Sequence, residues 1–227
     1  MNILLACEES QAVCKEFRKR GHEAYSCDIL PCSGGHPEWH IKTEIAKVLN
    51  GAFQAFGQFW TEEGTVERID KWDMVIAFPP CTYLTVTGNK WFNVDRYGEK
   101  AIQRKQDRLD AIEFFMSFAN YNCGKIVIEN PIGVMSTEWR KPDQIIHPYY
   151  FGDPERKSTC LWLKGVQPLK HDKNNHVEPN IIKYKNGKGT DSKWHMDTMK
   201  LPPAERSKAR SKTFPGIAKA MATQWGN

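Results

Sequence analysis

Four short, mainly apolar segments constrain the fold more than any other feature of the sequence. They cover residues 2–6, 23–27, 73–77 and 125–129, and stretches with helical spacing separate them. Strands buried on both faces of a parallel sheet have this character, and each needs a crossover helix to reach the next strand. We therefore predict an α/β fold with a mostly parallel central sheet.

Helical spacing is clearest in two of the intervening stretches. Val13 and Phe17, followed by a basic run and Gly21, predict a helix directly after the first strand. A longer crossover helix is predicted before residue 125, and its apolar side chains are expected to face the core. They are Ile102, Leu109, Ile112, Phe115, Met116 and Phe118.

Chemically suggestive residues follow each predicted strand. They lie at residues 7–10, at Asp28, at residues 79–81 and at residues 129–130. The carboxyl ends of parallel strands meet at one edge of an open sheet, and ligands collect at that edge. The sequence therefore predicts that these four segments converge on one functional site.

Length and composition favour one domain spanning residues 1–227. The chain has no apolar run of about 18 residues, the length that spans a bilayer, and its first ten residues lack a signal-peptide pattern. Its seven cysteines are scattered, so we expect them to be reduced and mostly structural. These features predict a cytoplasmic protein without membrane contact.

Charge is unevenly distributed along the chain. Residues 1–150 hold 17 basic and 20 acidic side chains, whereas residues 151–227 hold 15 and 7. Within the basic part, residues 165–205 lack apolar periodicity, and we expect a small basic excursion from the core. Basic residues interleaved with aromatic ones suit contact with nucleic acid, and a solvated lysine-rich face explains the charge equally well.

Cys81 follows two prolines at the end of a predicted strand. The fixed φ angles of Pro79 and Pro80 would present its sulfur on a stiff loop, which suits a nucleophile. Such a thiol needs a nearby positive charge or helix N-terminus to ionise at neutral pH. An inert buried cysteine is the simpler interpretation of any one cysteine.

Glu129 ends the next predicted strand in a similar way. Asn130 and Pro131 follow it, so a carboxyl group lies at the sheet edge beside a residue that cannot continue the strand. Partial burial would raise the pKa of this carboxyl group and let it donate a proton to a heteroatom. An ordinary surface turn would also explain these residues.

The order of these motifs resembles the cytosine-C5 DNA methyltransferase family. The pattern FPPC at residues 78–81 precedes EN at residues 129–130, which begins 48 residues after the cysteine. Much of the chain outside residues 50–65 and 170–200 looks like the compact methyltransferase-like proteins of phages and prophages. The segments concerned are CEESQ, PCSGGHPEWHI, WDMVIAFPPCTYLT, IENPIG, ERKSTCLWL and FPGIAKAMATQWG.

The resemblance implies a Rossmann-like, S-adenosylmethionine-dependent fold and a set of catalytic roles. Cys81 would attack C6 of a cytosine in DNA while Glu129 contacts N3, so that C5 accepts the methyl group. Asn130 would hold the cysteine loop. Arg156 would stabilise charge at the base's O2, with Lys157 as its rival for that role and a solvated basic turn as the equal alternative. A cytosine in a duplex would have to be flipped out, and a single strand would present it directly.

For the cofactor, the resemblance places Ala6, Cys7 and Glu8 in the loop after the first strand. Asp28 would accept hydrogen bonds from the ribose, and a plain turn residue is the equal alternative. Two further cofactor positions complete the set that the resemblance implies. These are Glu44, as a third acidic position, and Pro79.

The sequence departs from the larger family in two places. The usual glycine-rich turn after the first strand is replaced by CEESQ, and the large DNA-recognition region is reduced to roughly residues 165–205. These departures leave two other functions open. The chain could modify C5 of a free pyrimidine nucleotide, or use another donor, or it could be a catalytically silent nucleic-acid-binding relative.

One cysteine and histidine cluster also has the residue types of a metal site. Cys27, Cys32, His36 and His40 have the spacing C-x4-C-x3-H-x3-H. This spacing matches compact zinc motifs poorly, and the prolines and glycines between them favour a shaped loop near the cofactor. We predict no metal here.

Overall fold

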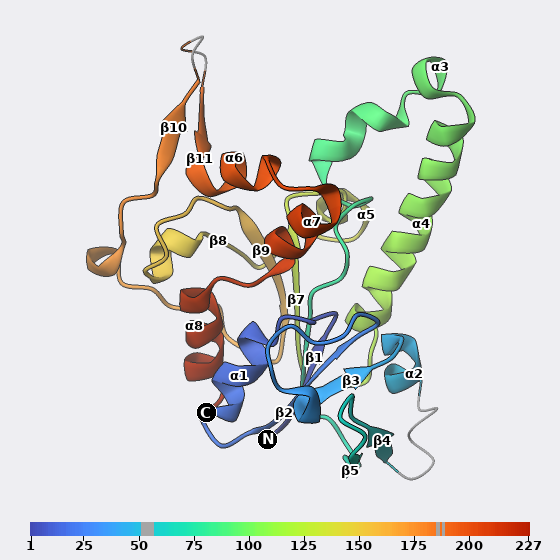
Figure 1. Cartoon of the computed structure of the whole chain (residues 1–227), viewed down its shortest axis with the longest axis vertical. Helices are drawn as coiled ribbons and strands as arrows, with labels where there is room; N and C mark the ends of the chain where they lie inside the picture. The colour runs from blue at the N-terminus through green and yellow to red at the C-terminus, as the bar shows by residue number, and fades with distance from the viewer. Residues whose placement is uncertain (51–56, 185–186, 188) are drawn as a thin grey trace.

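The computed structural model describes residues 1–50, 57–184, 187 and 189–227. In that part of the chain the central sheet has the strand order β3-β2-β1-β6-β7-β9-β8 (Figure 1). Its strands are β1 (Asn2–Ala6), β2 (Glu23–Asp28), β3 (His40–Lys42), β6 (Met74–Ala77), β7 (Lys125–Pro131), β8 (Gln144–Ile146) and β9 (Thr159–Lys164).

The sheet is parallel except for one strand. β3, β2, β1, β6 and β7 pair in parallel, and β9 lies antiparallel between β7 and β8. This order defines a Rossmann-like methyltransferase fold, so the predicted fold class is confirmed. Two small hairpins lie outside the sheet: β4 (Gln58–Trp60) with β5 (Val66–Arg68), and β10 (Ile181–Lys183) with β11 (Thr190–Ser192).

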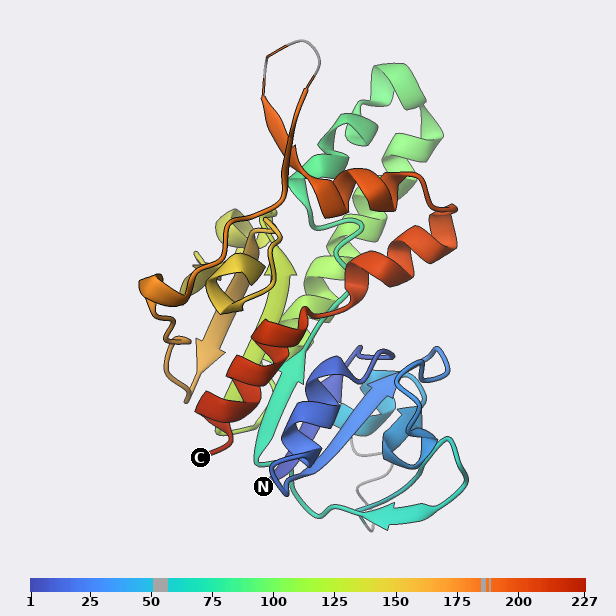
Figure 2. The ribbon, with the colours of Figure 1, turned by 60° about the vertical axis from the view of Figure 1, so that its left-hand side comes forward.

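Helices cover both faces of the sheet (Figure 2). The α-helices are α1 (Ala12–Arg18), α2 (Ile45–Leu49), α3 (Val94–Tyr97), α4 (Glu99–Ala119), α5 (Met135–Glu138), α6 (Lys193–Met199), α7 (Pro203–Ser211) and α8 (Pro215–Trp225). Short 3-10 helices are η1 (Pro37–Trp39), η2 (Val86–Phe92), η3 (Pro148–Phe151) and η4 (Lys173–Asn175).

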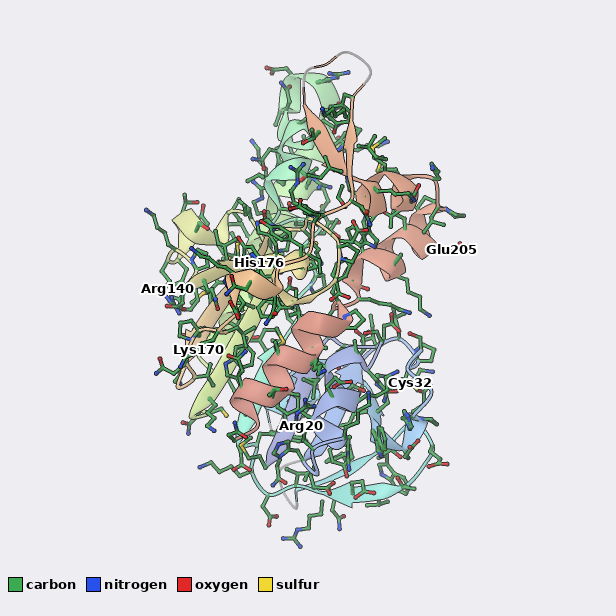
Figure 3. The ribbon with its side chains drawn as sticks, turned by 90° about the vertical axis from the view of Figure 1, so that its left-hand side faces the viewer. Arg20, Cys32, Arg140, Lys170, His176 and Glu205 are labelled. Atoms are coloured by element: carbon green, nitrogen blue, oxygen red, sulfur yellow. The ribbon has the colours of Figure 1, made fainter. Side chains whose placement is uncertain are left out.

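Alternation along β1 explains why there are two cores. Ile3 and Leu5 point to the face covered by α1 and α8, whereas Leu4 and Ala6 point to the face covered by α2 and α4. Arg20, which follows α1, donates to the hydroxyl of Thr223 on α8 at 2.6 Å and joins the two helices on the first face. Arg20 is labelled in Figure 3.

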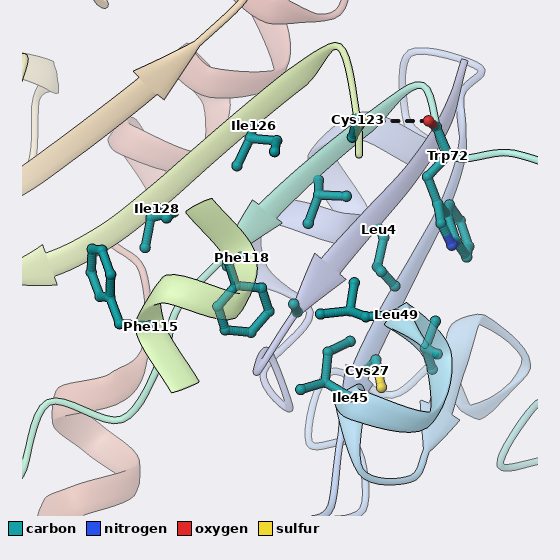
Figure 4. Close-up of a cluster of buried hydrophobic side chains, with 14 of the residues drawn as sticks. Leu4, Cys27, Ile45, Leu49, Trp72, Phe115, Phe118, Cys123, Ile126 and Ile128 are labelled. Carbon is teal, nitrogen blue, oxygen red and sulfur yellow. Dashed lines mark hydrogen bonds between the residues drawn. The ribbon is translucent and has the colours of Figure 1, made fainter. Parts of the chain in front are cut away.

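The second core shows where the prediction for the long helix was right and where it was wrong. Phe115 and Phe118 of α4 are fully buried, on the side of the sheet where Ile126 and Ile128 of β7 lie (Figure 4). Ile102 and Leu109, which were also predicted to face the core, are 57% and 58% exposed.

Two structures project beyond the carboxyl ends of the parallel strands. One contains η2, α3 and the first half of α4, and the other contains β10, β11 and α6 (Figures 1 and 2). Ile102 and Leu109 are exposed because their half of α4 extends past the sheet. The predicted excursion at residues 165–205 contains the hairpin, α6 and the start of α7, while its residues 185, 186 and 188 lie outside the described part.

No helix in the described ranges has both the length and the apolar character needed to cross a membrane.

Candidate active site

Cys81 lies on a rigid turn just past the end of β6. Pro79 is buried, whereas Pro80 and Cys81 are exposed. The backbone N–H groups of Leu84 and Thr85 both donate to the Cys81 carbonyl oxygen at 3.0 Å, which fixes the backbone on the far side of the cysteine. Of the seven cysteines, Cys81 alone is exposed. The turn therefore presents its sulfur to ligands.

Asn130 ties this turn to the neighbouring strand. Its side chain is buried on β7, and its Nδ2 donates to the carbonyl oxygen of Pro79 at 2.7 Å. The hydrogen bond holds the Cys81 turn against the end of β7, where Glu129 precedes Asn130. Cys81 and Glu129, which are 48 residues apart in the sequence, thus lie at neighbouring strand ends that are held together.

Glu129 has an oxygen atom that the protein leaves without a partner. Its Oε1 is inaccessible to solvent and accepts no hydrogen bond from any described residue. Burial raises the pKa of the Glu129 carboxyl group, and the positive charge of Lys157 partly opposes this rise. A small cavity beside the carboxyl group is lined by Lys157, Thr159 and Phe214 among others. A neutral carboxyl group in this position can donate a hydrogen bond.

The charges around Cys81 come from three different elements. The surrounding protein raises the pKa of the Cys81 thiol, and the Glu129 carboxylate raises it further. Lys157, which precedes β9, and Arg210, on α7, act in the opposite direction. The structure therefore brings Cys81, Glu129 and Asn130 together, and adds two cations to them.

Arg156 faces a different part of the molecule. Its Nη2 donates to the carbonyl oxygen and to the hydroxyl of Thr190 on β11, at 3.0 and 3.1 Å. Its positive charge acts to lower the pKa values of His147, Tyr149 and Tyr184. Lys157 was the other candidate from the sequence for the role given to Arg156. Of the two residues, it is the one whose positive charge acts to lower the pKa of both Cys81 and Glu129.

The loop after β1 uses its polar groups within the chain. Glu8 is buried, and its carboxylate accepts hydrogen bonds from the backbone N–H groups of Val13 at 2.6 Å and Cys14 at 3.2 Å. It therefore satisfies the N-terminus of α1. Burial nonetheless raises the pKa of Glu8 to about 7. The structure does not turn this predicted cofactor residue toward a ligand.

Two non-glycine residues adopt left-handed backbone conformations in the same loop. Cys7 has φ 61° and Gln11 has φ 55°, a backbone conformation that favours glycine. Gln11 is held by hydrogen bonds from its amide group to His36 O at 2.8 Å and from His36 N at 3.1 Å. Ala6 and Cys7 were both predicted to contact the cofactor. Ala6 is fully buried in β1 and offers only its backbone to a ligand, whereas Cys7 is partly buried.

The other predicted cofactor residues lie at the same edge. Asp28 ends β2, and its Oδ1 accepts a hydrogen bond from Leu30 N at 2.9 Å. Burial raises the pKa of Asp28. Ile29 and Leu30 beside it are 65% and 51% exposed. Glu44 follows β3, is exposed and lies 3.8 Å from the ammonium group of Lys47.

Glu9 is a residue that the sequence prediction missed. It is 5% exposed, its Oε2 accepts a hydrogen bond from the Ser33 hydroxyl, and its Oε1 is buried without a partner in the described structure. The negative charge of Glu9 adds to the rise in the pKa of Asp28. The sequence placed Glu9 in the convergent loop, but nothing in the spacing separates it from Glu8.

The loop after Cys81 is held by two arginines of α4, which the sequence also did not single out. Arg104 donates to Thr82 O at 3.1 Å, and Arg108 donates to Tyr83 O at 2.8 Å. The Arg108 guanidinium lies 3.6 Å from the centre of the Phe92 ring. This segment is therefore fastened to the projecting helix along much of its length.

The cysteine and histidine cluster has separate partners for each member. Cys27 Sγ contacts Thr43 O at 3.6 Å, and His40 lies between Ser26 Oγ and Leu30 O at 2.8 and 2.9 Å. The His36 ring stacks on Trp39, and Glu62 contributes to a raised pKa of the Cys32 thiol. Within the described residues, no group of three or more histidine, cysteine, aspartate or glutamate side chains is arranged to hold a metal ion.

Comparisons with known proteins give one structural likeness to report. No family model matches the chain, and no curated protein matches it. A search of solved structures finds 45 matching chains. One is an E. coli structure described as a candidate DNA modification methyltransferase encoded within a prophage, 13% identical, with a TM-score of 0.42. The match covers 89% of this chain and 56% of that one, so this chain spans little more than half its length.

Proposed function

We propose that this protein is a DNA methyltransferase that transfers a methyl group from S-adenosylmethionine to C5 of cytosine through a covalent bond to Cys81. One observation carries the proposal. The hydrogen bond from Asn130 to Pro79 O, at 2.7 Å, holds the Cys81 turn beside the end of β7 that carries Glu129. A nucleophile and a proton donor are thereby placed where a pyrimidine ring can meet both.

The residues take the following roles in the proposed reaction. The Cys81 thiolate adds to C6 of cytosine while protonated Glu129 donates to N3, and the electron pair of the C5–C6 bond becomes available at C5. When bound, S-adenosylmethionine supplies an electrophilic methyl group to C5 and leaves as S-adenosylhomocysteine. A base then removes the C5 proton, the C5–C6 double bond re-forms as the cysteine is released as thiolate, and the N3 proton returns to Glu129. The raised pKa of Glu129 favours the protonated form that this role requires.

The cofactor would bind at the carboxyl ends of β1 and β2. Asp28 supplies a carboxylate for the ribose hydroxyls, and the exposed Ile29 and Leu30 offer apolar surface for the adenine ring. The unpartnered Oε1 of Glu9 can accept a hydrogen bond from the cofactor's ammonium group. These residues offer a carboxylate, an unpartnered acceptor and apolar surface for the ribose, ammonium and adenine groups of S-adenosylmethionine. No phosphate-binding loop is needed, because this cofactor has no phosphate.

DNA would lie across the carboxyl edge of the sheet, between the two projecting structures. η2, α3 and the first half of α4 carry Lys90, Arg96 and Lys100, and the opposite structure and α7 carry several further basic residues. They include Lys183, Lys193, Lys200, Arg206 and Lys208. Phosphate contacts from both sides would position a strand over Cys81, and a flipped or single-stranded cytosine could then enter the site.

The test is transfer of labelled methyl to duplex DNA, single-stranded DNA and dCMP in parallel. We expect label at cytosine C5 in DNA, and at least a thousandfold loss in Cys81→Ser, because the weaker hydroxyl nucleophile replaces the thiolate. Cys123→Ser, at a cysteine before the start of β7 whose thiol donates to Trp72 O and Lys125 O, is the matched control and should retain activity. Unchanged transfer in Cys81→Ser contradicts the proposal.

A catalytically silent nucleic-acid-binding protein is the second candidate. The observation that favours it is the loop after β1, where Glu8 is used to hold α1 and Cys7 and Gln11 take the place of glycines. Binding of S-adenosylmethionine separates the candidates, since only the enzyme requires it. Label on dCMP alone would instead indicate modification of a free nucleotide.

A further inference from the structure

Two adjacent basic side chains diverge in the segment that leads into β9. Arg156 is bound to Thr190 of the hairpin by two hydrogen bonds. Lys157 lies on the side of Glu129, and the two residues line the same small cavity. Arg156, the residue that the family resemblance predicts to stabilise charge on the base, is therefore directed toward the hairpin. Its neighbour Lys157 lies beside Glu129 in the candidate active site.

Lys157 is positioned by contacts from α6 and α7. Its Nζ donates to the carbonyl oxygen of Arg210 at 3.3 Å and lies 6.0 Å from the centre of the Trp194 ring. An ammonium group has three donors, and this is the one hydrogen bond from Nζ in the part of the chain that the structure describes. The remaining donors are free to meet an anion beside Glu129.

We propose that Lys157, and not Arg156, supplies the positive charge that stabilises the Cys81 thiolate. The inference rests on the proposed function in taking Cys81 as the nucleophile. Arg156 is held away from the site by the hairpin, whereas Lys157 shares a cavity with Glu129 and keeps donors for an anion.

The charged groups that face the thiol are consistent with this assignment. Glu129 on β7 is the anion that opposes thiolate formation, and Lys157 and Arg210 are the cations that favour it. The Arg210 guanidinium is already bound to Thr198 Oγ1 at 2.9 Å and to His195 O at 3.2 Å. Lys157 keeps two of its three donors for an anion, and of these two cations it is the one that lines the cavity beside Glu129.

The experiment measures the pH dependence of Cys81 alkylation by iodoacetamide in the full chain, followed at the Cys81 peptide by mass spectrometry. Lys157→Met removes the charge and keeps the length of the side chain. It should move the alkylation midpoint to higher pH and slow the reaction at pH 7.5 by about three- to tenfold, because the thiolate is the reacting species. Lys157→Arg should restore most of the rate.

Arg156→Met is the matched control and should change the rate by less than about twofold. Alkylation of Cys32 serves as the internal reference in every sample, and circular dichroism confirms that each variant is folded. The inference is overturned if Lys157→Met titrates like the wild type, or if Arg156→Met shifts the midpoint as far.

The outcome is separable from that of the proposed function. Alkylation does not require DNA or S-adenosylmethionine, so a Lys157 effect without any methyl transfer would support this inference and remove the proposed reaction. Normal methyl transfer with no Lys157 effect would do the reverse.

Discussion

The loops after β1 and after β6 lie at the same edge of the sheet and use their polar residues differently. In the first loop, the Glu8 carboxylate binds the N-terminus of α1 and the Gln11 amide binds His36. At the second, Cys81 is exposed and Glu129 on the adjoining strand keeps an oxygen without a partner. Glu8 and Gln11 are thus satisfied within the chain, whereas Glu129, like Glu9 of the first loop, keeps a buried oxygen that no described residue binds.

The difference gives a criterion for choosing candidate ligand-binding residues at a strand end. Residue type and position are alike in Glu8 and Glu129, since both are carboxylates near the carboxyl ends of parallel strands. What distinguishes them is whether their hydrogen-bonding capacity is already used. A buried polar atom without a partner costs free energy, so its presence points to a ligand.

The largest expected effect tests the unsatisfied side of this comparison. Glu129→Gln should lower methyl transfer by about 100- to 10,000-fold, because the amide cannot deliver a proton to N3. The melting temperature should change by less than about 2 °C, because Oε1 has no hydrogen bond to lose. Single-turnover transfer and thermal melts measure the two quantities, and a large loss of stability with full activity would reverse the roles we assign.

The second-largest expected effect concerns Glu8, whose hydrogen bonds are satisfied within the chain, and it is a change of stability with pH. Burial raises the pKa of Glu8 from 4.5 to about 7 in the folded state. Its contribution to stability is therefore complete below pH 4.5 and is lost as the pH rises through 7. Relative to Glu8→Gln, which does not titrate, the wild type should lose about 2 kcal/mol of unfolding free energy between pH 5 and pH 8.

Urea unfolding of both proteins at several pH values provides that measurement. Glu8→Ala is the control for the helix contacts, since it removes both hydrogen bonds to α1 and should be less stable than Glu8→Gln at every pH. Parallel curves for the wild type and Glu8→Gln would show that Glu8 does not titrate in this range.

The smallest expected effect concerns the backbone of the first loop. Cys7 has φ 61°, a conformation that costs residues other than glycine about 1–2 kcal/mol. Cys7→Gly should remain within about 1 kcal/mol of the wild type, because the relief of strain is offset by the flexibility of unfolded glycine. Cys7→Val should lose about 1–2 kcal/mol more, since a branched side chain fits a positive φ poorly.

Chemical denaturation ranks these variants. If Cys7→Gly were less stable than Cys7→Val, side-chain packing rather than backbone strain would dominate at this position.

Much of the fold follows from the sequence because local patterns determine it. The four predicted strands correspond to β1, β2, β6 and β7, and the crossover helix corresponds to α4. The position of β9 did not follow, because antiparallel insertion between β7 and β8 depends on long-range pairing that no local period records. Ile102 and Leu109 failed as core residues for a related reason, since helical spacing does not tell how far the sheet beneath a helix extends.

The placement of the candidate site's residues was predictable where residue chemistry and strand position coincide. Cys81, Glu129 and Asn130 all lie where two neighbouring strand ends place them. The sequence could not tell which of Glu8 and Glu9 is used by α1, or whether Arg156 or Lys157 faces Glu129. Such choices between adjacent residues depend on side-chain direction, which the final packing decides.

Arg104 and Arg108 have a consequence for the thermodynamics of substrate binding. They fasten the chain after Cys81 to α4 before any ligand arrives, so the entropy of ordering this segment is lost during folding rather than during association. Binding to this part of the site should therefore carry a smaller entropic penalty than closure of a free loop would. The affinity for DNA should accordingly weaken less steeply on warming than it would for an enzyme that must order the corresponding segment around its substrate.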